Sequence, residues 1–491
     1  MERRDVTPEE YRAMSADDKT ELIEKSPFLK AHMRNGELFV LQSWTASGGG
    51  VSGEGTRYDT ARNPVATGSF HLHVDSVAVF ETNHVQASSA AGFITLLAVV
   101  TVAVAVMCLV NPKNCFGSCP TFYLAGHERP VAEGFSASIA PSLEATDVDA
   151  LDASTVGAGR FDVVMKNEAY ETHVVRHVNL LAFPVRDGAR IAQALDGTFW
   201  SARQWNAPLA ARGPEGDCAQ ALRAADGVER YSLADSTNLA AKETIELSFA
   251  NPRAGRSGFV IGSRQTLLST YLLYQTFAYM GRDAGHWIAE LERGKLGDAG
   301  NALIERLGGI ELSIESEPGV WTEVGEVLEF GPIAIDQHMV AFDAPASWTG
   351  RARVHMTKGA WRIDNIMLAS LDTPVEPIRL APREVLKDGA ADANALALLT
   401  DPAQALTTLP GDTYALVYDL PRENDTYQVF LESRGYYLEW MREEWMHEEN
   451  PAFLAELFFD PDAALKRLAP EFKRVEPGME QAFWGSRYAK P

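Results

Sequence analysis

The sequence predicts a mainly β protein with helical additions, and three observations lead to this fold class. Apolar and polar residues alternate along many short segments, which is the two-residue period of a strand. Tight turns that contain glycine or asparagine separate several of these segments. Helical spacing is confined to a few stretches, chiefly near the two ends of the chain. We therefore expect a small N-terminal β-barrel, an apolar helix, a β-sandwich-like region and a helical C-terminus.

Length and charge narrow the functional classes. The chain has 491 residues, enough for several domains that each bury a core. Its 67 acidic residues outnumber 44 basic ones, which gives a formal net charge of −23. Such a surface repels nucleic acid and anionic lipid, because both bind through neutralising cations. We expect no nucleic-acid partner, and the four cysteines are too few for a scaffold built from disulfides.

The first predicted domain covers residues 1–86. Residues 7–25 are expected to be helical, because Thr7 is a good cap and Pro8 favours the first turn. From Phe28 the period changes to two, and a turn at 34–36 predicts a hairpin. Several short strands with tight turns then predict a small barrel.

The most informative stretch is Ala87–Val110, which contains no charged residue over 24 positions. A helix rises about 1.5 Å per residue, so this run can cross a hydrocarbon core about 30 Å thick. We therefore predict a transmembrane or membrane-docked segment at residues 87–111. Its valines also favour strand, so a buried β-hairpin is the competing interpretation. Met1–Asp5 lacks the apolar region of a signal peptide, which leaves export through the internal span or through an upstream leader.

Two cysteines follow the apolar run directly. Cys115 and Cys119 are four positions apart, and an oxidising compartment would let them form a local disulfide. A thiol-redox role needs a thiolate of low pKa, usually in a Cys-x-x-Cys motif at a helix start. Here the spacing is longer and Pro120 directs the chain toward an extended strand. Thiol exchange and copper handling therefore stay as alternatives to a structural bridge.

The rest of the chain divides into three predicted regions. Residues 112–300 are expected to form a β-rich domain with a buried helix at 267–280, which is too short to span a membrane. Residues 301–373 are expected to form a β-sandwich-like region with Trp321 and Trp361 at least partly buried. Residues 374–491 supply a linker with one short helix, two strands within 414–431, and helices from Tyr436 onward.

Four segments resemble a family of uncharacterised bacterial exported proteins and lipoproteins. They are 111–123, which contains Cys-Phe-Gly-Ser-Cys-Pro-Thr-Phe-Tyr, 75–83, 167–173 and 431–440. The resemblance covers nearly the whole chain and implies no established activity. It does imply a membrane-associated location in the bacterial cell envelope, with the bulk of the chain outside the cytoplasm. Relatives often begin with a lipoprotein signal, which this sequence does not show.

Histidine pairs are the main candidates for a metal site. His173 and His177 have the spacing of a helical zinc clamp, but the valines between them favour a surface strand. On a strand the two imidazoles stand about 13 Å apart, which is too far for one metal. His71 and His73 lie on one face of a predicted strand. As an alternative, they form a cation site together with His32 on a strand opposite them. In each case we favour the interpretation that the histidines are ordinary strand residues, so we predict no metal and no cofactor.

Two further groups complete the candidate residues. Asp336 and His338 near Ser313 or Ser316 suggest a catalytic triad, but no Gly-x-Ser-x-Gly elbow supports it. Aromatic side chains with helical spacing predict either core packing or a partner-binding surface. They are Tyr436, Tyr437, Trp440 and Trp445.

The leading hypothesis is a non-enzymatic, membrane-associated envelope protein that binds a ligand or a partner protein. The first alternative is a thiol-redox or copper-handling envelope protein that uses Cys115 and Cys119. The second alternative is a hydrolase with an unidentified site.

Overall fold

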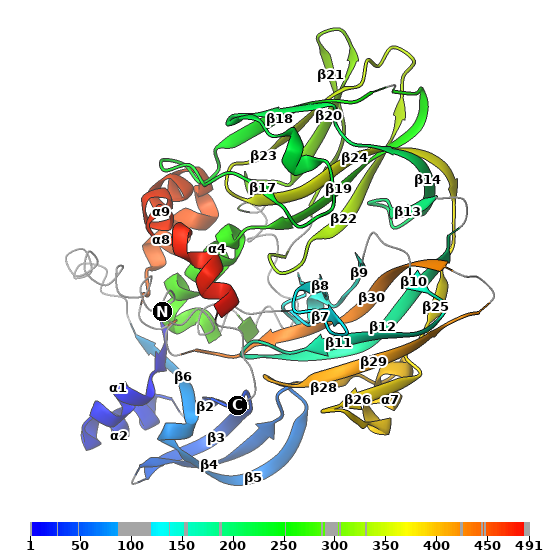
Figure 1. The fold of residues 1–491 in the computed structure, drawn as a ribbon. Helices are drawn as coiled ribbons and strands as arrows, with labels where there is room; N and C mark the ends of the chain where they lie inside the picture. Colours follow the sequence, from blue (N-terminus) through cyan, green and yellow to red (C-terminus); the bar gives the residue numbers. More distant parts are fainter. Residues whose placement is uncertain are drawn as a thin grey trace.

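The computed structural model confirms the mainly β fold class (Figure 1). Its described residues form five sheets of six strands each, with helices at the N-terminus, between the strands and at the C-terminus. The described residues are 2–485 without 27, 48, 87–118, 137, 152–155, 186–188, 251, 286–287, 290–302, 304–305, 329–330, 423–425, 443–444 and 446–447.

The N-terminal region forms one antiparallel sheet with the strand order β1-β6-β2-β3-β4-β5. The predicted barrel is not closed by the described strands, because β1 and β5 lie at opposite ends of this order. Thr7 and Ser15 each cap a helix with a capping box, so the predicted helix is divided in two. The elements are β1 Glu2–Val6, α1 Pro8–Ala13, α2 Ala16–Lys25, β2 Leu29–Met33, β3 Leu38–Ser47, β4 Gly50–Tyr58, β5 Pro64–His73 and β6 Val77–Gln86.

Two sheets form the middle of the molecule and share a core. One has the order β27-β26-β29-β11-β7-β8, and the other contains β10-β30-β12-β25 with β9 and β28 beside it. Tyr418 and Tyr427 are fully buried within this core. The strands are β7 Thr121–Leu124, β8 Pro130–Glu133, β9 Ala145–Ala150, β10 Val156–Gly157, β11 Gly159–Lys166, β12 Glu171–Pro184, β25 Ile378–Leu380, β26 Glu384–Lys387, β27 Ala390–Ala391, β28 Leu406–Thr408, β29 Thr413–Leu420 and β30 Thr426–Glu439. The predicted short helix of the linker is α7 Ala393–Thr400.

Two more antiparallel sheets contain the strands of the predicted region 301–373, but that region does not form them alone, because seven of their strands come from residues 190–265. The orders are β13-β14-β24-β19-β22, with β17 beside β24, and β16-β15-β18-β23-β20-β21. Trp361 is 2% exposed in the shared core and Trp321 is half-buried, as predicted. Strands from both sides of residue 300 build each sheet. The strands are β13 Arg190–Gln193, β14 Phe199–Asn206, β15 Ala210–Gly213, β16 Gly216–Asp217, β17 Arg230–Tyr231, β18 Lys242–Ser248, β19 Gly255–Gln265, β20 Ile310–Glu317, β21 Val320–Val327, β22 Asp336–Ala344, β23 Arg351–Thr357 and β24 Trp361–Pro374.

Three helices pack together beside the sheets (Figure 1). The predicted buried helix is confirmed as α4 Leu267–Met280, capped by the Thr266 hydroxyl. It packs against α8 Pro451–Phe459 and α9 Pro461–Gly485 through the ring pairs Tyr271–Phe472 and Tyr279–Phe453. The C-terminal helices begin at Pro451 and not at Tyr436, because β30 continues to Glu439.

The predicted apolar segment at 87–111 lies outside the described residues. Among the residues that the structure describes, no helix is long and apolar enough to cross a bilayer. The membrane-spanning interpretation and the competing β-hairpin therefore both stay predictions.

Candidate functional site

Strand β5 is the outer strand of the N-terminal sheet. It pairs with β4 along its whole length, from Pro64 opposite Tyr58 to His73 opposite Gly50. No described strand pairs with its other side. Its ten residues include no charged side chain, and all six positions of 64–69 are exposed. A long edge of this kind presents main-chain hydrogen-bonding groups to a further strand, without the charges that normally prevent such pairing.

The other outer strands among the described sheets differ from β5 in length or in charge. β21 carries Glu323 and Glu326, and β22 carries Asp336 and Asp343. β1 contains four charged residues in five, and β9 contains two aspartates in six. The remaining outer strands are two to four residues long. The uncharged edge of β5 is therefore distinctive among the described strands.

The turn before β5 holds the strand in a fixed position. The Asp59 carboxylate accepts hydrogen bonds from the main-chain N–H groups of Ala61 and Asn63, at 2.9 and 2.8 Å. Ala61 packs against the buried cluster of Val174, Tyr436 and Leu438 in the central sheet. Toward the end of the strand, Leu72 is buried in the N-terminal core. β5 is consequently anchored near both ends, while its edge and its first six side chains are exposed.

Two histidines stand on β5 beside this edge. His71 and His73 are both exposed, and their ring centroids are 5.0 Å apart with an interplanar angle of 83°. Nδ1 of His71 lies 2.9 Å from the Ser52 hydroxyl on β4. His32 is not their neighbour, since it is buried on β2 and its Nε2 lies 3.1 Å from Glu81 Oε2 on β6. Of the three histidines in the cation-site alternative, the structure brings together His71 and His73 and leaves His32 apart.

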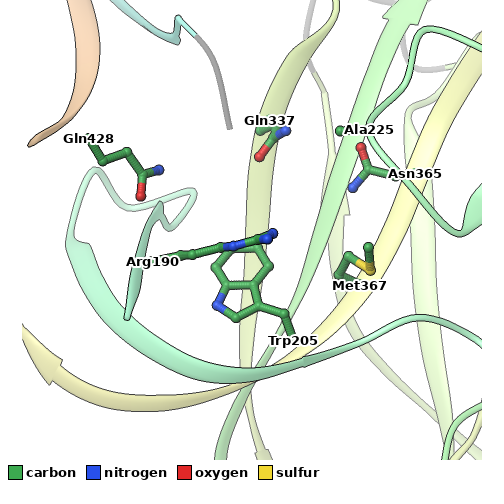
Figure 2. Close-up of a pocket in the computed structure, with 7 residues that line it drawn as sticks. All are labelled: Arg190, Trp205, Ala225, Gln337, Asn365, Met367 and Gln428. Carbon is green, nitrogen blue, oxygen red and sulfur yellow. The ribbon is translucent and has the colours of Figure 1, made fainter. Parts of the chain in front are cut away.

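A small hollow opens where β13, β14, β22 and β24 approach β30 (Figure 2). Its volume of about 30 Å³ holds one or two water molecules and is far smaller than an ordinary ligand pocket. The guanidinium of Arg190, which lines the hollow, lies over the ring of Trp205, and its carbon is 5.5 Å from the ring centroid. The Gln428 amide makes two hydrogen bonds with the main chain of Ile191, both 2.8 Å long. The Gln428 amide therefore joins β30 to β13 beside the hollow.

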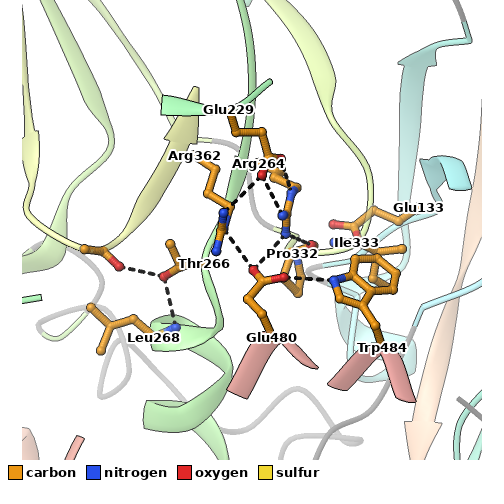
Figure 3. A network of polar contacts seen from close by, with 11 residues as sticks. Glu133, Glu229, Arg264, Thr266, Leu268, Pro332, Ile333, Arg362, Glu480 and Trp484 are labelled. Atoms are coloured by element: carbon orange, nitrogen blue, oxygen red, sulfur yellow. Dashed lines mark hydrogen bonds and ion pairs between the residues drawn. The ribbon is translucent and has the colours of Figure 1, made fainter. Parts of the chain in front are cut away.

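An ion-pair network joins the sandwich to α9 (Figure 3). Arg264 and Arg362 both contact Glu229 and Glu480, and Glu480 also accepts a 2.8 Å hydrogen bond from the Trp484 indole. Arg264 additionally donates a 2.8 Å hydrogen bond to the carbonyl of Pro332. Two cations face two carboxylates here, so their charges are compensated within the protein. The network is suited to fixing α9 in place.

A second group of buried polar residues lies where α4 meets the end of β30. Glu439 accepts hydrogen bonds from the Tyr274 hydroxyl at 2.6 Å and from Arg442 at 2.8 Å. Burial, together with the negative charge of Glu439, raises the pKa of Tyr274 well above its usual value. On the adjoining strand β12, the fully buried His173 and Glu171 side chains are 2.8 Å apart. The prediction that His173 lies on a surface strand is therefore wrong about exposure and right about the strand.

The predicted disulfide involves one residue inside and one outside the described part of the chain. Cys119 is buried, whereas Cys115 lies outside the described residues. Burial raises the pKa of the Cys119 thiol, and the negative charges of Glu133 and Glu171 raise it further. This is the reverse of the electropositive setting that activates a redox or metal-transfer thiol. The pairing of Cys115 with Cys119 itself stays a prediction.

For the four aromatic residues Tyr436, Tyr437, Trp440 and Trp445, the structure bears out the core-packing interpretation and not the partner-binding one. All four side chains are buried, and the first two belong to strand β30 rather than to a helix. The Trp440 indole donates a hydrogen bond to the Thr172 hydroxyl, and the Trp445 ring stacks on Phe277 at 4.9 Å. They form core contacts and do not form an exposed surface for a partner.

The elements of a triad are not assembled. Nε2 of His338 lies 3.0 Å from Oδ2 of Asp336 on β22, but Ser313 and Ser316 lie on β20 in the other sheet of the sandwich. The Ser316 hydroxyl is 2.8 Å from that of Thr322 on β21. Within the described part of the chain, no three His, Cys, Asp or Glu side chains converge on a common metal position.

No protein-family model matches the chain, and no curated protein matches it.

The edge of β5 is the most distinctive feature of the described strands, and it was not predicted from the sequence. A signal was present, because residues 64–73 form a strand-like segment of ten without a charge. What the sequence lacks is the strand order, and only that order places β5 at an edge.

Proposed function

We propose that this is a non-enzymatic, membrane-associated protein of the bacterial cell envelope that binds another envelope protein by strand addition at β5. The observation that carries the proposal is the exposed, uncharged, ten-residue edge of β5 among described outer strands that are short or charged. An extended segment of the partner would continue the N-terminal sheet as a further antiparallel or parallel strand.

The chemistry of strand addition fits this edge. Main-chain N–H and C=O groups supply most of the affinity, and they need no charged side chain. Val65 and Ala66 are both exposed and point to opposite faces, as neighbours on a strand do. A partner strand can therefore contact small apolar side chains on both faces of the sheet. The anchored turn at Asp59 keeps the edge ordered before the partner binds, which lowers the entropic cost of association.

Membrane association rests on the sequence. The uncharged run Ala87–Val110 follows β6 closely, so a membrane anchor there would hold the N-terminal sheet near the bilayer. The resemblance to exported proteins and lipoproteins supports the same location. An anchor raises the effective concentration of envelope partners near the edge of β5.

The alternative functions have less support. A thiol-redox or copper-handling role would use Cys115 and Cys119, but the surroundings of Cys119 disfavour its thiolate. A hydrolase would need a nucleophile beside the Asp336–His338 pair, and the candidate serines belong to the other sheet. Neither alternative accounts for the edge of β5.

The experiment compares partner recovery by charged variants of the edge. Val65→Lys with Ala66→Lys places one positive charge on each face of β5, which natural edge strands use to prevent pairing. We expect at least a tenfold loss of the partner that co-purifies from envelope membranes with the full chain. Leu209→Lys is the matched control, because Leu209 is 61% exposed on a different part of the surface. Equal recovery by the edge variant and the control would contradict the proposal.

A further inference from the structure

A rolled sheet encloses the hollow that opens beside β30 (Figure 2). The strands β13-β14-β24-β19-β22 curve until the two outer ones meet, because Ala194, directly after β13, forms a main-chain bridge with Met339 of β22. The Leu195 N–H donates a 3.3 Å hydrogen bond to the Met339 carbonyl. The enclosed face is apolar, with Ala192 and Val260 buried in its core. The end of such an enclosure is a common place for a small-molecule site.

Three polar side chains stand at one end of this enclosed core, namely Arg190, Gln337 and Asn365. Each lies two positions before an apolar residue in or against the core, so the alternation of a strand turns it toward the same inner face. Their strands β13, β22 and β24 run in one direction, which places the three at the same end. Gly262 pairs with both Gln337 and Asn365, and a Cβ there would lie 2.3 Å from Asn365 Oδ1. The glycine therefore leaves the space between the two amides open.

Arg190 supplies positive charge at the mouth of the hollow. Of the described side chains that line the hollow, Arg190 alone is charged, and no carboxylate among the described residues forms an ion pair with it. Its side chain is exposed and lies over the Trp205 ring. Figure 2 shows it extending across the hollow from the side of Gln428 toward Asn365. Stacking on the indole holds the guanidinium plane and leaves the donors along its edge for a planar oxyanion.

Asn365 supplies a hydrogen-bond acceptor at the inner end. Its side chain is 2% exposed, and no hydrogen bond reaches its Oδ1 in the part of the chain that the structure describes. A buried acceptor without a donor is costly, so native proteins normally provide one. The site therefore favours a ligand that is negatively charged toward Arg190 and carries a hydrogen-bond donor toward Asn365.

We propose that the hollow binds one hydrogen carbonate ion, with its charged oxygens on Arg190 and its hydroxyl donating to Asn365 Oδ1. Hydrogen carbonate is a small planar anion with a single hydroxyl, which matches one cation and one free acceptor. The volume of about 30 Å³ admits the innermost atoms of such an ion, and the exposed Arg190 holds the others at the mouth. The hollow and β5 belong to different sheets, so this inference does not rest on strand addition.

The test is calorimetric titration of the full chain in detergent at pH 8, with sodium hydrogen carbonate and with sodium nitrate. Nitrate has the same planar shape and charge but no hydroxyl. We expect one hydrogen carbonate ion per chain and at least tenfold weaker binding of nitrate, because nitrate leaves Asn365 Oδ1 without a donor. Arg190→Gln should weaken the binding of hydrogen carbonate at least tenfold. Arg253→Gln is the matched control, because Arg253 is an exposed arginine that does not line the hollow.

A further variant isolates the contact with the hydroxyl. Asn365→Leu keeps a side chain of similar size and removes the buried acceptor, so this variant should bind hydrogen carbonate no more tightly than nitrate. Circular dichroism should be the same for all variants, and if Asn365→Leu does not fold, the comparison of the two anions on the wild-type chain decides. No binding of hydrogen carbonate, equal wild-type affinity for the two anions, or an equal loss in Arg190→Gln and Arg253→Gln would overturn the proposal.

Discussion

At the scale of single residues, buried charges are compensated by close partners. Glu81 is 5% exposed and contacts His32 at 3.1 Å and Lys30 at 2.9 Å. Burial alone would raise the pKa of the Glu81 carboxyl, but the hydrogen bond from His32 and the charge of Lys30 outweigh it and lower the pKa to about 2. An ionised Glu81 therefore contributes to the stability of the N-terminal sheet at neutral pH.

We predict that Glu81→Gln destabilises the protein by about 2–3 kcal/mol at pH 7. Because the pKa of Glu81 is lower in the folded than in the unfolded protein, its ionised form stabilises the fold at any pH above the unfolded value of about 4.5. This stabilisation is lost as the pH falls toward about 2. The difference in thermal midpoint between wild type and variant should thus be smaller at pH 3 than at pH 7. Glu21→Gln is the control, because its ion pair with Lys25 is exposed and contributes little. An unchanged midpoint for Glu81→Gln at pH 7 would refute this account of the sheet.

Glu448 shows the opposite shift. It is buried against α4, where the Gln275 amide donates a 2.6 Å hydrogen bond to its carboxyl. Burial raises its pKa to about 7, so the ionised form costs stability. Below about pH 4.5 the carboxyl is protonated in both states and has no effect on stability. The cost grows between pH 4.5 and about 7 and is complete above that.

We predict that Glu448→Gln stabilises the protein by about 1–3 kcal/mol at pH 8 and leaves it unchanged at pH 4. The measurement is the thermal midpoint of both proteins across this range. Glu24→Gln, at an exposed position of α2, is the control for the loss of a surface carboxylate. A stabilisation by Glu448→Gln that is as large at pH 4 as at pH 8 would contradict the raised pKa.

At the scale of elements, local signals predicted what local interactions determine. Thr7 and Pro8 predict the start of α1, and the bounds of α4 coincide with the apolar segment 267–280. The end of β30 was misread as a helix for a physical reason. Tyr436 and Leu438 pack on one face of its sheet and Tyr437 on the other, so both faces are buried and the alternation disappears. The continuous aromatic run then resembles a helix in sequence.

The close packing around β30 gives a prediction about Gly435. A Cβ at Gly435 would lie 2.3 Å from the carbonyl oxygen of Val174 and 2.9 Å from the Phe135 ring. We expect Gly435→Ala to destabilise the protein by about 2 kcal/mol or more, because β30 must shift away from β12. Gly157→Ala on the paired strand β10 is the control, since nothing lies within 4 Å of its Cβ position. Equal urea midpoints for the two variants would show that β30 is packed more loosely than this.

At the scale of the whole molecule, the fold depends on pairings between distant segments. β12 pairs with β30, more than 240 residues later in the chain, and β18 pairs with β23 across residue 300. Such pairings follow from the total burial of all the sheets, and no single segment encodes them. The sequence therefore predicts the fold class and the sandwich strands, but it does not predict strand order. For the same reason the sequence did not reveal the candidate site, because only the strand order shows that β5 lies at the edge of its sheet.

The position of β5 at the edge of its sheet makes partner binding there testable. If a partner chain lies along β5, a chemical probe on this strand should form an adduct with that partner. A probe elsewhere on the exposed surface should not. Position 65 is suited to this, since Val65 is 51% exposed and lies near the anchored turn at Asp59. Position 209 offers a comparably exposed apolar side chain for comparison.

The most direct measurement is photocross-linking of the full chain in envelope membranes, with benzoylphenylalanine in place of Val65 or of Leu209. We expect an adduct with one other envelope protein from position 65 and none from position 209. Mass spectrometry should map the link to a single extended segment of that protein. No adduct at position 65, the same adducts from both positions, or links only to a second copy of this chain would contradict partner binding at β5.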